Sequence, residues 1–172
     1  QGPVHCAVVL DLMGHDVGIP GLEDLVFVTG METDPGLAVV LGDGPEVDGV
    51  RLVPTLNRYV GDMSDHHAFR EDGRPYLFFS CGRCEHYHMR TDTPEKLNYE
   101  KMAAFAELLF AILPAICAQA LSGPFEGYDS APTECRFMNR SLGSVLGPMG
   151  VTVSSREDLT RVVSTLMERF GL

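Results

Sequence analysis

The 172-residue sequence predicts a single α/β domain, in which helices cover a sheet. Three short apolar runs, at residues 4–12, 25–29 and 76–80, have the length and β-branched or aromatic content of strands. Helical patterns at residues 35–41 and 99–121 lie between or after these runs. Hydrophobic residues make up 45% of the chain, which argues against disorder and is enough for one full core.

The first half of the sequence alternates strand and helix signals. Residues 4–12, VHCAVVLDL, are almost continuously apolar and predict a strand buried on both faces. After the strand at residues 25–29, Thr33 and Pro35 are suited to the start of a short helix. Residues 50–56 predict a weaker strand, which Pro54 places at an edge or a bulge.

The second half is predicted to be mainly helical. Asn98 is suited to cap the long helix at residues 99–121, and Pro114 is expected to kink it. Residues 125–148 predict a loop with short ordered pieces. Ser154 and Glu157 match a capping box before a final amphipathic helix. We therefore divide the chain into a main part, residues 1–125, and an extension, residues 126–172, that packs on the same domain.

Charge and hydropathy limit the possible partners. The net charge of −11 argues against nucleic acid and against anionic membrane surfaces. Residues 102–121 are about long enough to cross a bilayer. Glu107 and Pro114 interrupt this run, so we expect a kinked, buried helix instead. Neither property excludes a small peptide as a ligand.

The number of cysteines, five, is odd and argues against a disulfide scaffold. Cys6 and Cys117 lie in apolar runs and are expected to be buried thiols. Cys81 and Cys84 form a CxxC motif, which superficially resembles part of a zinc knuckle together with nearby histidines. A structural zinc site needs a second ligand pair, which the sequence lacks. We therefore expect a local disulfide or two free thiols at Cys81 and Cys84.

Two residues point to a functional site. Asp11 interrupts an apolar run near the carboxyl end of a predicted strand, where it caps a loop or binds a partner. His88 follows the strand at residues 76–80. If these strands are parallel, both side chains lie at the sheet edge where α/β proteins bind ligands. Carboxylate and imidazole suit zinc, although His88 could also be merely solvated. Asp92 could orient His88 or cap the next helix.

Several motifs together resemble the second half of the di-zinc aminopeptidase family. They are VVLDLMG, SDHHAF and YHMRTDTPEKLNYEKM, in this order around the apolar strand YLFFS. The family includes secreted bacterial aminopeptidases, and glutamate carboxypeptidase and glutaminyl cyclase are relatives. The resemblance covers about residues 5–112. It implies a three-layer αβα sandwich with a mixed sheet, of which residues 1–125 supply the carboxyl-terminal half and leave the sheet incomplete.

The resemblance also implies roles for individual residues. The family site holds two zinc ions that share a water, and the resemblance makes Asp11 a ligand of one ion and His88 a ligand of the other. Tyr87 matches a tyrosine that hydrogen-bonds the tetrahedral intermediate in some members. Asp65 and Asp92 match acids that, in the family, contact the metal-ligating side chains and not the metal itself. Met89 replaces the threonine commonly found after the histidine.

The resemblance implies a zinc-dependent aminopeptidase that hydrolyses peptides, with a periplasmic or secreted location favoured. The family's first half carries a histidine, a bridging aspartate and a glutamate pair, and none of these precedes Asp11 here. We therefore expect this chain alone to be inactive and a separate amino-terminal chain or a missing segment to complete the site. The alternatives are a non-catalytic binding or assembly module with the peptidase fold, and a glutaminyl cyclase-like acyltransferase.

Overall fold

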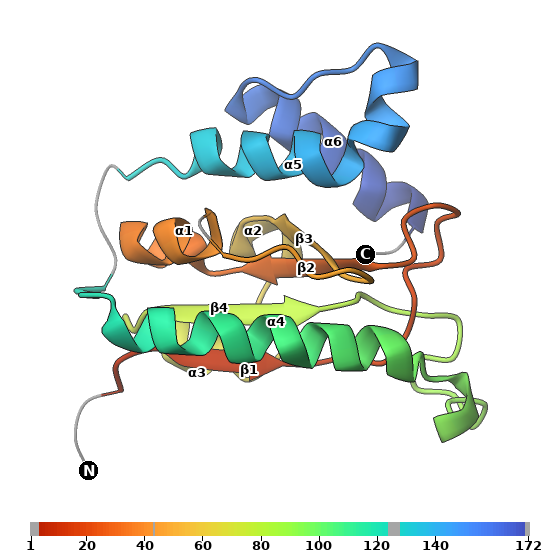
Figure 1. Ribbon diagram of the computed structural model, residues 1–172, viewed down its shortest axis with the longest axis horizontal. Coiled ribbons are helices and arrows are strands. Elements are labelled where there is room, and N and C mark those ends of the chain that lie inside the picture. The colour runs from red at the N-terminus through yellow and green to blue at the C-terminus, as the bar shows by residue number, and fades with distance from the viewer. Residues whose placement is uncertain (1–3, 43, 124–127, 171–172) are drawn as a thin grey trace.

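A computed structural model describes residues 4–42, 44–123 and 128–170. Its centre is a four-stranded mixed sheet in the order β1-β4-β2-β3 (Figure 1). The strands are β1 (Ala7–Leu10), β2 (Leu25–Thr29), β3 (Arg51–Pro54) and β4 (Tyr76–Ser80). β4 is parallel to β1 and antiparallel to β2, and β2 is parallel to β3.

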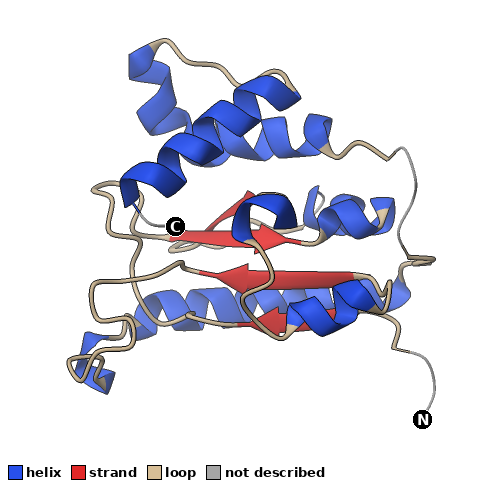
Figure 2. Cartoon of the chain, turned by 180° about the vertical axis from the view of Figure 1, so that it is seen from behind, coloured by secondary structure: helices blue, strands red, loops and turns tan. Residues whose placement is uncertain are grey.

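Helices cover both faces of this sheet. The helices are α1 (Pro35–Gly42), α2 (Asn57–Val60), α3 (His66–Glu71), α4 (Tyr99–Ala118), α5 (Ala131–Leu146) and α6 (Arg156–Phe170). The short 3-10 helices are Met31–Thr33, Pro94–Lys96 and Gly147–Met149. α1 and α4 lie on one face, and α2 and α3 lie on the opposite face (Figures 1 and 2). The predicted α/β sandwich with a mixed sheet is therefore confirmed.

β4 is the central structural element, because all five of its residues are buried. Alternate side chains of a strand point to opposite faces. Leu77 and Phe79 pack in the cluster under α1 and α4, and Phe79 meets Phe105 edge to face at 5.3 Å between ring centroids. Tyr76 and Phe78 pack in the separate cluster on the α3 side.

The two outer strands differ in how well the sequence predicted them. β3 lies at one edge of the sheet, as Pro54 indicated. β1 lies at the other edge and pairs only with β4 among the described residues. The prediction that residues 4–12 are buried on both faces is wrong, since Leu10 is 46% exposed and Val8 and Val9 are half-buried. An apolar run that lies at an edge has no second neighbour to cover it.

α4 begins where the sequence predicted, with the Asn98 side chain accepting a hydrogen bond from the Lys101 amide at 2.9 Å. The helix is long and apolar enough to cross a membrane by length and composition, and 28% of that span is buried. Only its sheet-facing side is covered, so the expectation that the helix is buried holds for this side alone. Phe110 is 80% exposed, and Cys117, predicted to be buried, is also exposed.

The extension contains more helix than expected. α5 occupies most of the stretch predicted as loop and packs against β3, and α6 packs on α5. The capping box before α6 is shifted by one residue, because the Asp158 amide donates to the Ser155 hydroxyl at 3.1 Å. The division of the chain at residue 125 stays a prediction, and residues 124–127 lie outside the described part.

The sheet core provides a first test. Replacing the fully buried Phe79 by Ala should lower the free energy of unfolding by about 3–5 kcal/mol, because it leaves a cavity between β4 and α4. Phe110→Ala removes the same group from an exposed site and should change stability by less than about 0.5 kcal/mol. Denaturant unfolding of both variants measures this. Equal losses would contradict the described packing of α4.

Candidate active site

The site residues come together because β1 and β4 run in the same direction. The pairing continues past both strands: the Asp11 amide donates to the Phe79 carbonyl at 3.1 Å, and the Cys81 amide donates to the Leu12 carbonyl at 3.3 Å. Asp11 therefore emerges beside the carboxyl end of β4, whose following loop carries Tyr87. The parallel orientation assumed from the sequence is confirmed.

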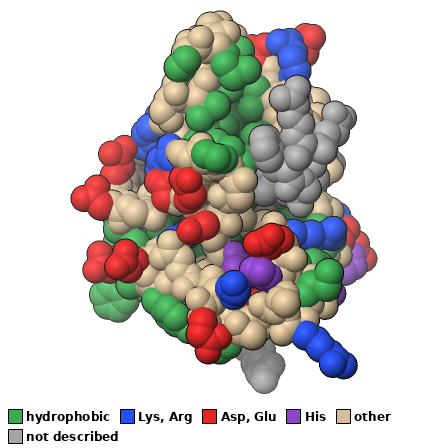
Figure 3. Space-filling model, turned by 90° about the vertical axis from the view of Figure 1, so that its right-hand side faces the viewer, with side chains coloured by type: hydrophobic (Ala, Val, Ile, Leu, Met, Phe, Trp, Pro, Cys, Tyr) green, Lys and Arg blue, Asp and Glu red, His purple; other side chains and the backbone are tan. Residues whose placement is uncertain are grey.

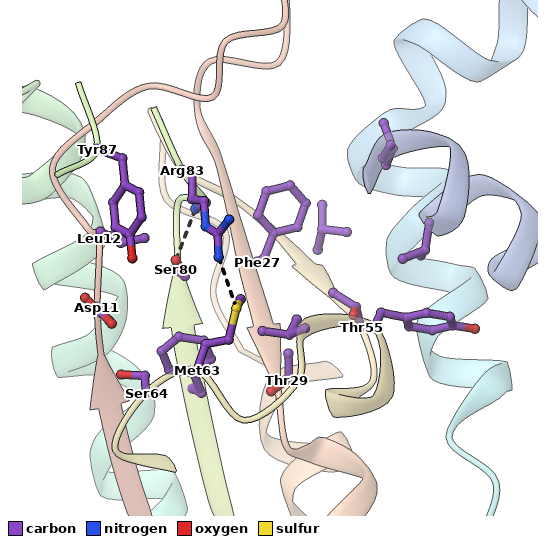
Figure 4. Close-up of a pocket in the computed structure, with 17 residues that line it drawn as sticks. Asp11, Leu12, Phe27, Thr29, Thr55, Met63, Ser64, Ser80, Arg83 and Tyr87 are labelled. Atoms are coloured by element: carbon purple, nitrogen blue, oxygen red, sulfur yellow. Dashed lines mark hydrogen bonds between the residues drawn. The ribbon is translucent and has the colours of Figure 1, made fainter. Parts of the chain in front are cut away.

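Asp11 and Tyr87 both line a cavity at this edge. Asp11 is half-buried, and its carboxylate accepts no hydrogen bond from the described residues. Tyr87 lies on the same side of the cavity as Asp11, with its hydroxyl end turned toward the aspartate (Figure 4). A half-buried carboxylate without a protein partner is available to a metal ion or a ligand.

His88 lies next to the cavity and not in its wall. Its exposed imidazole stacks on the Tyr87 ring, with 4.0 Å between ring centroids and 20° between ring planes. On this edge of the molecule, histidine side chains lie among acidic and basic ones (Figure 3). The structure thus places His88 at the same edge as Asp11, and its role as a metal ligand stays a prediction.

The backbone is strained directly after the predicted ligand Asp11 and at the predicted ligand His88. In the described chain, positive φ angles at residues other than glycine occur only at Leu12, with 56°, and at His88, with 59°. Leu12 directly follows Asp11, and its branched side chain makes this conformation unfavourable. Such strain costs roughly 1–3 kcal/mol per residue and concentrates at functional sites. The two outliers therefore mark this edge independently of any sequence motif.

The cavity has a volume of about 310 Å³ and a mixed lining. Asp11, Ser80 and Arg83 provide polar groups near Tyr87 (Figure 4). The Arg83 guanidinium lies 5.3 Å from the centre of the Tyr87 ring and donates to the Met63 sulfur at 3.2 Å. These contacts connect the loop after β4 with the segment before α3 across the cavity.

The acids predicted to support the ligands have other surroundings in the structure. Asp65 is exposed at the start of α3, without a capping hydrogen bond from its side chain. The Asp92 Oδ1 atom lies 3.0 Å from the His15 Nε2 atom. His15 is thus the described partner of Asp92. The proposed contacts of Asp65 and Asp92 with the metal-ligating side chains stay predictions.

The cysteines of the CxxC motif are two free thiols, one of the two states expected from the sequence. Cys81 is buried, and this burial raises the pKa of its thiol, so the thiol stays protonated at neutral pH. Among the described residues, no three His, Cys, Asp or Glu side chains gather closely enough to hold a metal ion.

His66, in the SDHHAF motif, has a structural role. It is fully buried and stacks on Phe78 at 4.3 Å between ring centroids. Its Nε2 lies 2.9 Å from the Asn57 Oδ1 and 3.1 Å from the Gly61 carbonyl, so Nε2 carries the proton. Burial lowers the pKa of His66, which keeps the ring neutral.

Sequence reasoning missed several cavity residues. Arg83 lies inside the CxxC motif, whose cysteines are the more obvious candidate ligands. Met63 directly precedes the SDHH run. Val163 and Leu166 belong to α6, far along the chain, and no local pattern links them to Asp11. The helical spacing of apolar residues on α6 predicted a buried face but not the surface that this face covers.

The sequence around the cavity identifies the class of protein. Residues 16–113, more than half of the 172-residue chain, match Peptidase family M28. The chain belongs to this peptidase family. The matched stretch contains Asp65, Tyr87, His88 and Asp92, whereas Asp11 lies five residues before it. No curated protein and no solved structure matches the sequence.

The strain at His88 makes a testable prediction. Alanine retains the Cβ that disfavours a positive φ, and glycine does not. His88→Gly should therefore be more stable than His88→Ala by about 1 kcal/mol. At His86, whose φ is not positive, the order should be reversed, because glycine gains entropy in the unfolded chain. Chemical denaturation of the four variants measures both differences. The same order at both positions would contradict the strain.

A second prediction concerns pH. The unfolded chain binds a proton at His66 near pH 6.5, whereas the folded state resists this proton. Stability should therefore be fully present above pH 6.5 and fall on acidification below it. His66→Gln should flatten this part of the pH profile, and the exposed control His67→Gln should not. Urea unfolding between pH 5 and 7.5 measures the slopes. An unchanged slope in His66→Gln would contradict a neutral, buried His66.

Proposed function

We propose that this chain is part of a zinc-dependent aminopeptidase, which removes amino-terminal residues from peptides. Asp11 is a ligand of one zinc ion and His88 is a ligand of a second. The observation that carries the proposal is the pair of left-handed residues: Leu12, which directly follows the predicted ligand Asp11, and His88, which is itself a predicted ligand. Strain of this kind persists where function requires a fixed side-chain direction.

The donor groups suit zinc. The Asp11 carboxylate has no described hydrogen-bond donor, and the His88 imidazole is exposed with its ring held against Tyr87. Carboxylate oxygen and imidazole nitrogen are both common zinc ligands. A catalytic zinc usually has three protein ligands, however, so these two residues do not complete two metal sites. We propose that a separate amino-terminal chain or segment supplies the remaining ligands and the general base.

The chain's own residues then bind and orient the substrate. Bound zinc would polarise the peptide carbonyl and lower the pKa of water. In this proposal Tyr87 donates a hydrogen bond to the oxygen that becomes negative, and the orientation of its hydroxyl toward Asp11 supports this role. The cavity beside Tyr87 receives the side chain of the amino-terminal residue. Ser80 and Arg83 line the cavity near this point and provide further hydrogen-bond donors.

A second candidate function is a non-catalytic binding or assembly module that has kept the peptidase fold. The small number of metal-binding side chains favours it, since no group of three gathers among the described residues. This candidate requires no zinc and no turnover. It can therefore be separated from the first by measuring both quantities on the same assembly.

Substitution of the proposed ligands tests the proposal on the intact assembly, meaning this chain together with the amino-terminal chain or segment proposed to complete the site. His88→Ala should lower zinc content and reduce hydrolysis of an aminoacyl-anilide at least about a hundredfold, because even residues behind a ligand contribute 10- to 100-fold. Asp11→Ala should act in the same way on the other ion. His67→Ala, an exposed histidine of α3, is the matched control and should leave both quantities unchanged.

Zinc content is measured by elemental analysis and turnover by release of the anilide chromophore. A fully zinc-loaded and fully active His88→Ala assembly would contradict the proposed role of His88. A wild-type assembly without zinc or turnover, even after addition of excess zinc, would favour the non-catalytic module.

A further inference from the structure

We propose that helix α6 forms the specificity wall of the cavity and that Val163 and Leu166 select an uncharged, apolar side chain of the amino-terminal residue. This inference rests on the proposed function, because the substrate's amino terminus must lie at Asp11 and Tyr87. It adds a substrate class and two specificity-determining residues to that function.

The cavity extends from the predicted catalytic edge to α6. Asp11 and Tyr87 line one side of it, and Val163 and Leu166 line it from α6. In Figure 4 the ribbons of the helical extension stand across the cavity from Asp11. A substrate group that starts at Asp11 and passes the Arg83–Met63 contact, which crosses the cavity, therefore meets α6.

The interior suits an apolar group. Between the two sides, the apolar surface comes mainly from Phe27, Val53, Val60 and Phe78 together with the α6 residues, and Thr29 and Thr55 add hydroxyl groups. The charged residues of the lining are Asp11 and Arg83, which both lie at the Tyr87 side. A charged substrate side chain that extends past Asp11 and Arg83 toward α6 would lose its hydration there and meet no group of opposite charge in the described lining. The volume of about 310 Å³ is at the small end for ligand pockets, so it fits one side chain.

α6 is held firmly enough to act as a wall. Its Leu159 is fully buried in the cluster that α5 and α6 form against β2 and β3. The Thr160 hydroxyl lies 2.6 Å from the Tyr59 hydroxyl, which links α6 to α2. Tyr59 itself lines the cavity, so this hydrogen bond connects two parts of the lining. At the start of α6, Arg156 pairs with the buried Glu134 of α5 at 2.8 Å.

The wall lies outside the stretch that matches the peptidase family. That stretch ends at residue 113, whereas α6 begins at Arg156. The family match alone would not identify Val163 and Leu166 as part of the site.

Variants of Leu166 test the inference on the intact assembly. This residue is half-buried, so changes in its size are tolerated better than changes at the buried Val163. Leu166→Phe narrows the cavity and should weaken binding of L-phenylalaninamide relative to L-alaninamide about tenfold. Leu166→Ala enlarges the cavity and should not weaken binding of L-phenylalaninamide relative to L-alaninamide. Thr165→Phe adds the same ring on the exposed side of α6 and is the matched control.

Binding is followed by the methyl NMR signals of labelled valine and leucine, which do not depend on turnover. In the wild-type assembly, L-phenylalaninamide should shift the signals of Val163 and Leu166 but not of Leu159, which does not line the cavity. Unshifted Val163 and Leu166 signals at saturation would overturn the inference. An unchanged ratio of the two dissociation constants in Leu166→Phe would overturn it as well.

The same experiment separates this inference from the proposed function. Binding with the predicted size dependence, but without hydrolysis in the presence of zinc, would reject the aminopeptidase and retain the apolar ligand class. Zinc-dependent hydrolysis with a preference that Leu166 variants do not change would retain the aminopeptidase and reject α6 as its specificity wall.

Discussion

The parallel pairing of β1 with β4 is the contact on which the candidate site depends. In the opposite orientation, Asp11 would emerge at the far end of β4 from Tyr87 and His88. The pairing is extended by the backbone hydrogen bonds of Asp11 with Phe79 and of Cys81 with Leu12. β4 can serve as the template for β1 because it is itself fixed, with every residue buried and β2 paired on its other side.

The loops at this edge are held by polar contacts that the sheet alone does not provide. Lys101 is buried at the start of α4, and its ammonium donates to the carbonyls of His15 and Glu23 at 3.1 and 2.7 Å. The Asn98 amide donates to the Gly14 carbonyl at 2.8 Å. A buried ammonium is tolerated only with such partners. α4 thus fixes the loop that follows Asp11, and this support helps to maintain the strained backbone at Leu12.

Local patterns were sufficient for the elements whose signals are local. β4 and the Asn98 cap of α4 follow from an apolar run and a capping residue, and Pro54 correctly placed β3 at an edge. The position of Asp11 and His88 at one edge required only the assumption of parallel strands. The motif-based resemblance also agrees with membership of peptidase family M28.

Features that depend on distant contacts could not be predicted in this way. The exposure of Leu10 arises because β1 has one described neighbour, which no periodicity reveals. α5 was missed because Gly143 and Pro132 weakened a helical spacing that Cys135, Met138 and Leu142 in fact carry on its buried side. The cavity joins residues of β2, β3, β4 and α6, so its shape exists only after folding. Likewise, the strain at His88 is a property of the folded loop.

Anomalous diffraction at the zinc absorption edge, from crystals of the intact assembly grown with zinc, tests the central claim most directly. We expect two peaks, one about 2.0–2.2 Å from an Asp11 carboxylate oxygen and one about 2.0–2.1 Å from a His88 ring nitrogen. Zinc bound elsewhere, with both side chains free of metal, would contradict this claim.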